Sequence, residues 1–318
     1  MNKYILLAAT ALTLAACSND DESLTNGPIK ARISAGVNTP KTRAINDQWE
    51  RDAIGVMVTK AESSNMADMY KNVKYTTTAN TNAAANFTAT TDQGIFFQDA
   101  EETVTFAAYA PYQESAANAL PGDGVIYGNT TDQSTRETQK AFDYIYASGA
   151  TASRSNPTVE FKGVNAFAHK MTRLVIIVKT SVQDGFTADQ VTSGTYSLSG
   201  LKHDGTFDVT SGTAAANTEG ETTDDWSLTE NSLKTEGETE QVTFTSILYP
   251  QTLGRELTFK AVIDGQTYVN RTDINPALEA GTSYTYTITV MKTGLVVSGC
   301  TISNWGNGSS GSGTAEMQ

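Results

Sequence analysis

Hydrophobic and polar residues alternate along much of this chain with a period of two, which is typical of β-strands that bury one face. The first clear case is segment 29–37, in which Lys30, Arg32 and Ser34 lie between apolar positions. The residues expected to share its buried face are Ile29, Ala31, Ile33, Ala35 and Val37. The pattern therefore predicts a half-buried strand near the N-terminus.

Further segments of the same kind follow, and short turn-forming stretches separate them. The predicted strands are 54–60, 102–112, 141–149, 173–180, 194–200, 205–210, 241–250, 256–264 and 282–291. A turn at 203–205 is expected to join Leu201 and Phe207 in a hairpin. Long helical periodicity is absent, so the pattern favours antiparallel β-sandwiches.

The length and the polar stretches suggest how the chain is divided. A chain of 318 residues is long enough for two domains. The polar stretch 153–157 is the predicted boundary, which gives an N-terminal domain at 44–157 and a C-terminal domain at 158–305. Residues 306–318 are rich in Gly and Ser and are expected to form a flexible tail. The G-x-G-x-x-G spacing inside this tail is not interpreted as a dinucleotide loop, because too few residues follow it.

The N-terminus has the features of a lipoprotein signal. Lys3 precedes an apolar run at 4–16 that is too short for a transmembrane helix but suits the core of a signal peptide. Leu-Ala-Ala-Cys at 14–17 matches the bacterial lipobox, which predicts cleavage between Ala16 and Cys17 and a lipid on the Cys17 thiol. The acyl chains contribute about 0.8 kcal/mol per buried CH₂, so they would anchor the precursor firmly. An ordinary signal peptide with a chance cysteine is the alternative.

Charge and residue counts narrow the possible partners and cofactors. Lys and Arg number 22 against 35 Asp and Glu, a net charge of −13 with no basic stripe, so no nucleic-acid partner is expected. The only cysteines are Cys17 and Cys300, and the only histidines are His169 and His203. These counts predict no disulfide in the mature chain, no metal site and no cofactor.

The residues form no evident catalytic constellation, so an enzyme is not predicted. His169 lacks a G-x-S-x-G nucleophile motif and is interpreted as structural, and His203 as a turn-flanking surface residue. Asp224 and Asp225 are interpreted as solvated loop charges rather than a glycosidase pair. Cys300 is interpreted as a small core residue, with a reactive thiol as the alternative. Three tryptophans are either packing residues or a sugar-binding platform: Trp49, Trp226 and Trp305.

A basic linker that contains a proline follows the first predicted strand. If a trypsin-like protease cut after Arg43, segment 29–37 would be severed from the chain on which it packs. Its five apolar side chains correspond to several kcal/mol of burial at about 25 cal/mol per Å². The vacated groove would invite a strand from another molecule, which is donor-strand exchange. The alternative is a permanent first strand that no protease removes.

Several stretches together resemble the fimbrillin family, the pilins of Bacteroidetes. They are CSNDDE, KTRA ahead of W and IGVMV, VTFAAYAPY, FDYIYASG, FAHKMTRLVIIV and AGTSYTYTITVMKTGLVVSGCTISNW. The resemblance implies two transthyretin-like antiparallel β-sandwich domains in tandem. It also implies export as a lipoprotein with lipid on Cys17, and the acids at 20–22 look like a surface-export signal. Finally, it implies that an Arg-specific protease removes the lipidated segment and that a strand of a neighbouring subunit fills the groove.

The resemblance assigns these roles to particular residues. The cut is expected between Arg43 and Ala44, which makes 17–43 a lipidated propeptide, and Arg32 and Arg51 are the runners-up. The candidate donor strand is 294–305, whose apolar residues are Leu295, Val296, Val297, Cys300 and Ile302.

Two functions are compatible with these residues. The first is a structural subunit of a cell-surface fimbria that supports adhesion. Its precursor is a lipoprotein of the outer membrane, and its mature form lies in an extracellular pilus with other pilin subunits. The second is a permanently anchored surface lipoprotein, a pilus anchor or tip adhesin, which binds a glycan or protein on a host or bacterial surface.

Overall fold

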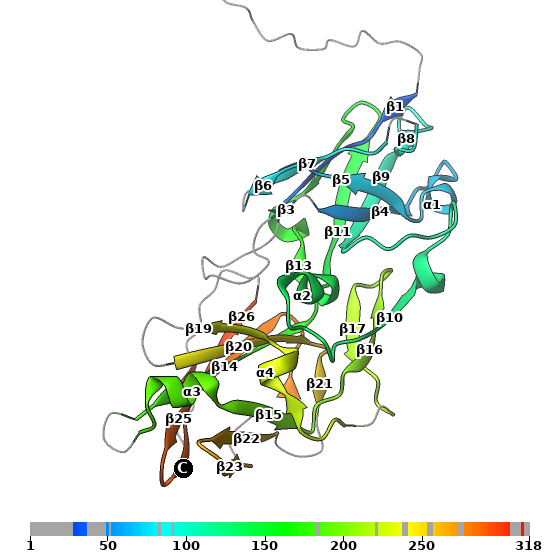
Figure 1. Ribbon diagram of the computed structural model, residues 1–318. Coiled ribbons are helices and arrows are strands. Elements are labelled where there is room, and N and C mark those ends of the chain that lie inside the picture. The colour runs from blue at the N-terminus through cyan, green and yellow to red at the C-terminus, as the bar shows by residue number, and fades with distance from the viewer. Residues whose placement is uncertain are drawn as a thin grey trace, which may run out of the picture.

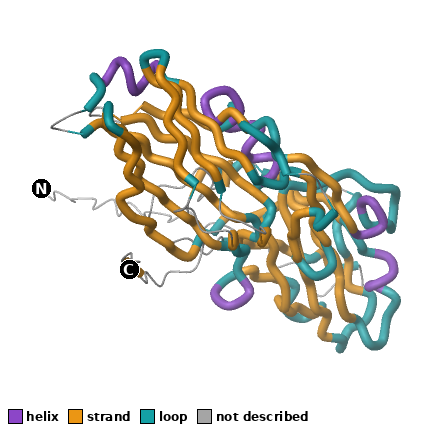
Figure 2. Tube along the Cα trace, turned by 90° about the horizontal axis from the view of Figure 1, so that it is seen from below, coloured by secondary structure: helices purple, strands orange, loops and turns teal. Residues whose placement is uncertain are grey.

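The chain is built mainly from β-strands, with a few short helices between them (Figure 1). This computed structural model describes residues 28–36, 49–50, 52–81, 84–90, 92–181, 185–219, 222–236, 241–252, 257–271, 277–305 and 313–314. The described strands form an N-terminal and a C-terminal group of sheets, and Figure 2 shows the two groups side by side.

Two sheets enclose the core of the N-terminal part. The larger has the order β13-β11-β9-β4-β5, and the smaller has the order β12-β2-β7. Their bounds are β13 (Ala168–His169), β11 (Ile145–Ser153), β9 (Thr103–Ala110), β4 (Ala53–Lys60), β5 (Val73–Thr76), β12 (Thr158–Phe161), β2 (Arg32–Ala35) and β7 (Ala85–Phe87). Alternate side chains of both sheets meet in one hydrophobic cluster, with Ile54 and Phe106 from one sheet and Ile33 and Phe161 from the other.

Two short ladders complete this part. They join β1 (Ile29–Lys30) to β8 (Phe96–Phe97) and β3 (Trp49–Glu50) to β6 (Asn80–Thr81).

The C-terminal part is a second pair of sheets around its own core. The six-stranded sheet has the order β19-β20-β14-β25-β26-β27, and the facing sheet has the order β18-β15-β22-β23. Their bounds are β19 (Leu233–Glu236), β20 (Gln241–Leu248), β14 (Thr172–Thr180), β25 (Thr282–Met291), β26 (Gly294–Asn304), β27 (Gly313–Thr314), β18 (Trp226–Ser227), β15 (Thr195–Ser199), β22 (Thr258–Ile263) and β23 (Gln266–Asn270). A further ladder joins β21 (Gln251–Thr252) to β24 (Ala277–Leu278). Leu174 and Tyr286 from one sheet and Leu198 and Phe259 from the other lie in the shared core.

A small third sheet joins the two parts. It consists of β10 (Val125–Asn129), β16 (Asp204–Asp208) and β17 (Thr213–Ala216), so strands from both halves of the chain pair in it. Its inner face packs in a separate hydrophobic cluster with the outer face of the larger N-terminal sheet, where Phe207 stacks on Tyr144 at 4.6 Å between ring centroids. Gly205 is required there, because a Cβ at this position would lie 2.4 Å from the ring of Tyr249. We call this hydrophobic cluster the junction cluster. Its buried members are Met57, Ala107, Tyr109, Tyr144, Tyr146, Met171, Phe207, Val209, Ala214, Ile247, Tyr249 and Trp305.

The helices are short and lie in the connections. They are α1 (Met66–Met69), α2 (Arg136–Phe142), α3 (Ala188–Ser193) and α4 (Leu228–Asn231), with 3₁₀ turns η1 (Pro121–Gly124) and η2 (Gly163–Asn165). Capping boxes start α2 at Thr135 and α3 at Thr187, where each side chain accepts the backbone N–H three residues on. None of the helices in the described segments has the length and apolar content needed to cross a membrane.

The structure confirms the prediction of antiparallel β-sandwiches, although β14 and β25, and also β2 and β12, pair in parallel. The predicted strand at 141–149 is wrong at its start, because residues 136–142 form α2. The predicted hairpin turn at 203–205 is also wrong, since Asp204 already begins β16. The N-terminal core runs past the predicted domain boundary, because Val159, Phe161 and Phe167 belong to it.

We expect Phe207→Ala to destabilise the protein by about 3–5 kcal/mol, because it removes a fully buried ring from the junction cluster. Urea unfolding followed by tryptophan fluorescence measures the change. Val164→Ala is the control, because Val164 is 99% exposed and its loss should change stability by no more than about 0.5 kcal/mol. Equal unfolding midpoints for the two variants would show that the junction cluster does not contribute to stability.

Candidate functional site

The segment 28–36 lies inside the N-terminal sandwich, where it pairs on both sides. Strand β2 runs parallel to β12, with Ile33 opposite Val159, and antiparallel to β7, with Ile33 opposite Phe87. Ahead of it, β1 pairs with β8. Strand β2 is therefore a central strand, and each of its edges is occupied by a strand from elsewhere in the sequence.

The predicted apolar face of this segment is buried, whereas the predicted polar face is exposed at Arg32 but buried at Ser34, which is 8% exposed. Ala31, Ile33 and Ala35 are 3%, 2% and 0% exposed and belong to the N-terminal core, while Ile29 is half-buried against it. Arg32 is exposed on the other face. The prediction of a half-buried strand is confirmed for these residues, and Val37 lies outside the described part of the chain.

Backbone hydrogen bonds hold the segment on both edges. Ala31 N donates to Ile95 O at 2.8 Å, and Arg32 N donates to Pro157 O at 2.8 Å. Toward its end, Gly36 N donates to Phe161 O at 2.9 Å, while Gly36 O accepts from Phe167 N at 3.0 Å. Without this segment, backbone groups of its neighbours and apolar side chains of the core would face water, and both changes are costly.

Trp49 closes one end of the space that the segment fills. Its indole N–H donates to Ala35 O at 3.1 Å, and its ring makes edge-on contacts with Phe87 and Phe167. Trp49 is 2% exposed, so it belongs to the core. We define the acceptor groove as the space between β7 and β12 that residues 28–36 occupy, with Trp49 at its end.

The residues predicted to be processed are not placed by the structure. Ala16, Cys17, Arg43 and Ala44 lie outside the described residues, and so does the whole linker 37–48. On its C-terminal side, the segment in the groove is joined to the rest of the chain only through that linker, between Gly36 and Trp49. The lipid site and the cleavage site therefore stay predictions.

The candidate donor strand is β26, and it lies in a different sheet from the acceptor groove. It pairs antiparallel with β25 from Gly294 opposite Met291 to Asn304 opposite Thr282. Val297 is buried in the C-terminal core, Leu295 and Cys300 pack against that core, and Ile302 is 37% exposed. Burial raises the pKa of the Cys300 thiol, which favours the interpretation as a packing residue over a reactive thiol.

The end of β26 is anchored by a buried histidine. The ring of Trp305 stacks on His169 at 4.0 Å between centroids, and the guanidinium of Arg173 lies over the Trp305 ring, 5.5 Å from its centroid. His169 Nδ1 lies 2.6 Å from Asp143 Oδ1, and both side chains are buried. His169 is thus a structural residue, as predicted from the sequence.

The prediction for His203 is wrong, because this residue is buried rather than on the surface. It is 3% exposed, its Nδ1 lies 3.1 Å from Thr130 Oγ1, and its ring packs against Trp226. Burial lowers the pKa of His203 to about 4, with opposing effects from its hydrogen bonding to Thr130 and the nearby Asp204 carboxylate.

The sugar-binding platform suggested for the tryptophans is excluded by their burial. Trp49, Trp226 and Trp305 are 2%, 2% and 3% exposed, so no ring face is available to a ligand. Each is a packing residue, and the indole N–H of Trp226 donates to Thr131 O at 2.9 Å.

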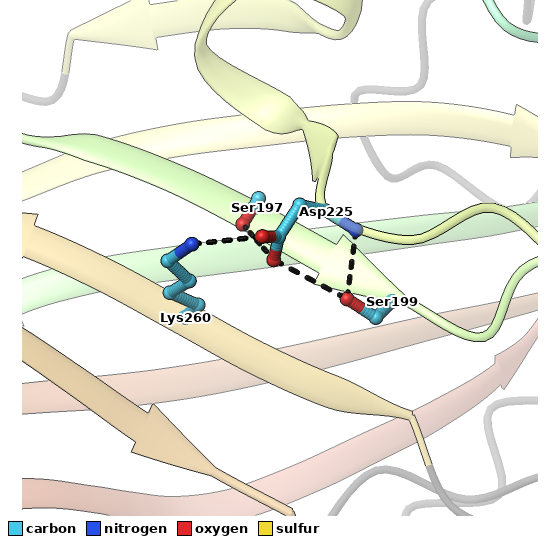
Figure 3. A network of polar contacts seen from close by, with 4 residues as sticks. All are labelled: Ser197, Ser199, Asp225 and Lys260. Carbon is cyan, nitrogen blue, oxygen red and sulfur yellow. Dashed lines mark hydrogen bonds and ion pairs between the residues drawn. The ribbon is translucent and has the colours of Figure 1, made fainter.

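Asp225 is part of a surface network rather than a catalytic pair. Lys260 Nζ lies 2.8 Å from Asp225 Oδ2, and Asp225 Oδ1 accepts from Ser197 and Ser199 at 3.4 Å each (Figure 3). Hydrogen bonding from Lys260 lowers the pKa of Asp225, so this carboxylate stays ionised. A general acid in a glycosidase needs the opposite shift.

The residues that complete the acceptor groove could not be found from sequence alone. Phe87, Val159 and Phe161 alternate with polar residues and so signal strands. Nothing in that pattern, however, indicates that these strands receive the segment 28–36. Pairing between strands far apart in sequence is a tertiary property.

Comparison with known proteins agrees with this architecture. Residues 42–305 match the model of the fimbrillin-like family. "Putative fimbrium subunit Fim1C" of Bacteroides uniformis is 33% identical over 331 residues, which cover 99% of this chain and 100% of the relative. The crystal structure of a "putative cell adhesion protein" from Bacteroides ovatus has a TM-score of 0.71 at 26% identity, covering 88% of this chain and 98% of that one. A protein of the same description from Bacteroides uniformis has a TM-score of 0.65 at 25% identity, covering 89% and 100%.

The fold defines a protein of two β-sandwiches in which β2, near the start of the described residues, is the central strand of its sheet. The chain belongs to the fimbrillin-like family.

We expect His203 to make the protein less stable as the pH falls from 6.5 toward 4. In that interval His203 is protonated in the unfolded chain, whereas the buried ring in the folded protein stays neutral. Because the unfolded state binds the extra proton, lowering the pH favours unfolding. From pH 7.5 to pH 5 the loss should be about 2 kcal/mol. Urea unfolding at both pH values measures it, and His203→Gln, whose side chain does not titrate, is the comparison. If both proteins lose the same stability between these pH values, His203 does not cause the effect.

Proposed function

We propose that this protein is a structural subunit of a cell-surface fimbria, exported as a lipoprotein precursor with lipid on Cys17. An Arg-specific protease cleaves it between Arg43 and Ala44, and the mature subunits polymerise by donor-strand exchange and support adhesion. The role is structural rather than enzymatic. Its partners are other pilin subunits, and before cleavage the outer membrane holds it through the lipid.

The observation that carries the proposal is the place of segment 28–36 in the fold. It is a central strand of the N-terminal sandwich, yet the proposed cut lies in the linker 37–48 that joins it to the following chain. After cleavage only non-covalent contacts would hold it in the acceptor groove. The match to the family model begins at residue 42, so it leaves this segment out, which agrees with a propeptide.

The energetics explain why an emptied groove would take up another strand. Burying a side chain such as Ile33 contributes about 1.5–3 kcal/mol, and the two alanines and the backbone hydrogen bonds add to it. A replacement strand regains these terms, because main-chain hydrogen bonds supply affinity and alternate side chains fill the pockets. It would pair with β12 on one edge and with β7 on the other, as β2 does.

In the proposal the donor is segment 294–305 of a neighbouring subunit. Its residues Leu295, Val297, Cys300 and Ile302 would supply apolar side chains to the groove. In this structure β26 pairs with β25 over its length. To donate the segment, the subunit would have to break these hydrogen bonds, and the segment would form new ones with β7 and β12 of the neighbouring subunit. The exposed side chains of Val296 and Ile302 leave apolar surface available for such an exchange.

A second function is favoured by the same pairing of β26. In a subunit that does not donate a strand, β26 would stay paired with β25, as it is in this structure. Such a subunit would keep its lipid and act as a permanently anchored surface lipoprotein, a pilus anchor or tip adhesin, that binds a glycan or host protein. The two functions predict different mature N-termini: Ala44 for the polymerising subunit and lipidated Cys17 for the anchored lipoprotein.

We expect Arg43→Ala to leave the protein folded, to keep the precursor at the membrane and to abolish polymers. The N-terminus of surface-sheared protein, determined by mass spectrometry, measures processing, with Ala44 expected in the wild type. Arg32→Ala is the control, because Arg32 is exposed on β2 and its loss should leave processing unchanged. A wild-type protein that begins at lipidated Cys17 in every fraction would favour the anchored lipoprotein, and normal polymers from Arg43→Ala would mean another cleavage site.

We expect the donor strand to be detectable by thiol crosslinking, because Cys300 is the only cysteine after the propeptide is removed and can be replaced. In mature protein that carries Asn86→Cys, Thr301→Cys and Cys300→Ser, a short bis-maleimide should link position 301 of one subunit to position 86 of the next. Asn86 is exposed between the groove-facing Ala85 and Phe87, and Thr301 lies next to the groove-filling Cys300 and so would face outward. Glu137→Cys in place of Asn86→Cys, on the exposed side of α2, is the control and should give no ladder. Polymers without crosslinks in the protein that carries Asn86→Cys would exclude 294–305 as the donor.

A further inference from the structure

A hollow with a mixed polar and apolar lining lies on the small third sheet, away from the acceptor groove. The sheet lies between the two sandwiches, whereas β1 and β8 are at the far N-terminal end (Figure 1). The hollow has a volume of about 680 Å³, and its lining comes from all of the strands of this sheet and the residues just after β17. This volume is in the range of small-ligand sites.

Tyr127 is the most prominent side chain of the hollow. It is 79% exposed, whereas most other aromatic side chains of the described segments are buried or half-buried. The register places Tyr127 opposite Thr206 and Asn129 opposite Asp204, so these four side chains lie on the same outer face. An exposed ring on a rigid strand is a surface on which a flat ligand can stack at little entropic cost.

The polar groups next to this ring are held in fixed positions. Asn129 Nδ2 donates to Asp204 Oδ1 at 2.8 Å, and Asn129 Oδ1 accepts from Thr131 N at 2.9 Å. Asp204 O accepts from Asn217 N at 2.8 Å, which ties the strand to the far side of the hollow. Donors and acceptors fixed by the protein lose little freedom when a ligand binds, so they favour specific hydrogen bonding.

The charge of the lining limits the class of ligand. The lining side chains are the carboxylate of Asp204 and neutral groups, and the chain carries a net charge of −13. A cation at the rim, Lys202 Nζ, already donates to the carbonyl oxygen of the lining Thr218. Phosphates, sulfates and acidic sugars need cationic partners and are disfavoured here. A neutral ligand that is apolar on one face and rich in hydroxyls at its edge fits this combination.

A protein partner fits less well. Stable protein interfaces bury about 800 Å² on each side around an apolar centre. The other large apolar side chains exposed in the described segments are Val164, Val269, Val296 and Ile302, and they lie on other elements than this sheet. Tyr127 is thus an isolated ring among polar groups rather than part of a large apolar patch.

We propose that this hollow binds a neutral pyranose of a surface glycan. The C–H face of the sugar stacks on the ring of Tyr127, and its hydroxyls bond to Asn129, Asp204 and Thr206. The site shares no residue with the acceptor groove, so the inference does not depend on cleavage or polymerisation. It also replaces the tryptophan platform, which burial excludes.

The test uses the full chain on an array of immobilised neutral and sialylated oligosaccharides, followed by titration calorimetry with the array oligosaccharide that gives the strongest signal. We expect binding to neutral oligosaccharides. Tyr127→Ala should weaken it at least about tenfold, which corresponds to about 1.4 kcal/mol. Tyr127→Phe should retain it within about threefold because the ring remains, and Asp204→Asn should weaken it through the lost carboxylate.

Val164→Ala is the matched control, since it removes an exposed side chain elsewhere and should bind as the wild type does. The circular dichroism of all variants should be unchanged, because Tyr127 and Asp204 are exposed. Absence of binding to every neutral oligosaccharide, binding to sialylated ones alone, or equal affinity in Tyr127→Ala would each overturn the proposal. A negative result in the glycan experiment would not argue against the fimbrial function, because that function is tested separately by the mature N-terminus.

Discussion

The pairing of β2 on both of its edges is the constraint on which the N-terminal sandwich depends. Its neighbours β7 and β12 come from later parts of the chain, and neither pairs with the other while residues 28–36 lie between them. The same segment covers one side of the core with Ala31, Ile33 and Ala35. Because sheet edges and an apolar core must both be covered, the space between β7 and β12 requires an occupant, and in this structure residues 28–36 fill it.

The junction between the sandwiches explains how the rest of the molecule is held to that site. The larger N-terminal sheet is apolar on both faces: Val56 and Val58 face the sandwich core, and Met57 faces the junction cluster. Phe207 and Tyr249 fill that cluster from the C-terminal half of the chain. The two halves are therefore joined by packed aromatic rings, and the third sheet, with its exposed Tyr127, rests on a rigid base.

Burial also shows which of the candidate functional residues are accessible to a ligand and which are packed in the protein interior. The three tryptophans and both histidines pack inside the protein, and Asp225 is paired with Lys260 on the surface. The ring that does face solvent, Tyr127, lies in the short strand β10, which was not predicted as a strand. Its sequence, VIYGN, has too few alternating positions to signal a strand. A strand of five residues is stabilised here by pairing with β16, which is 75 residues away at the Asn129–Asp204 contact.

The sequence by itself determined the class of fold, the alternation within segments such as 29–37 and 282–291, and the family resemblance, because these depend on local periodicity and on the order of short motifs. The segment 29–37 was correctly predicted as a half-buried strand over its described residues. Only the tertiary structure decided that this strand is central, that His203 is buried and that α2 precedes β11. Which strands pair, and which single side chains lose contact with water, depends on packing between residues far apart in the chain, and a local pattern of polar and apolar residues does not contain that information.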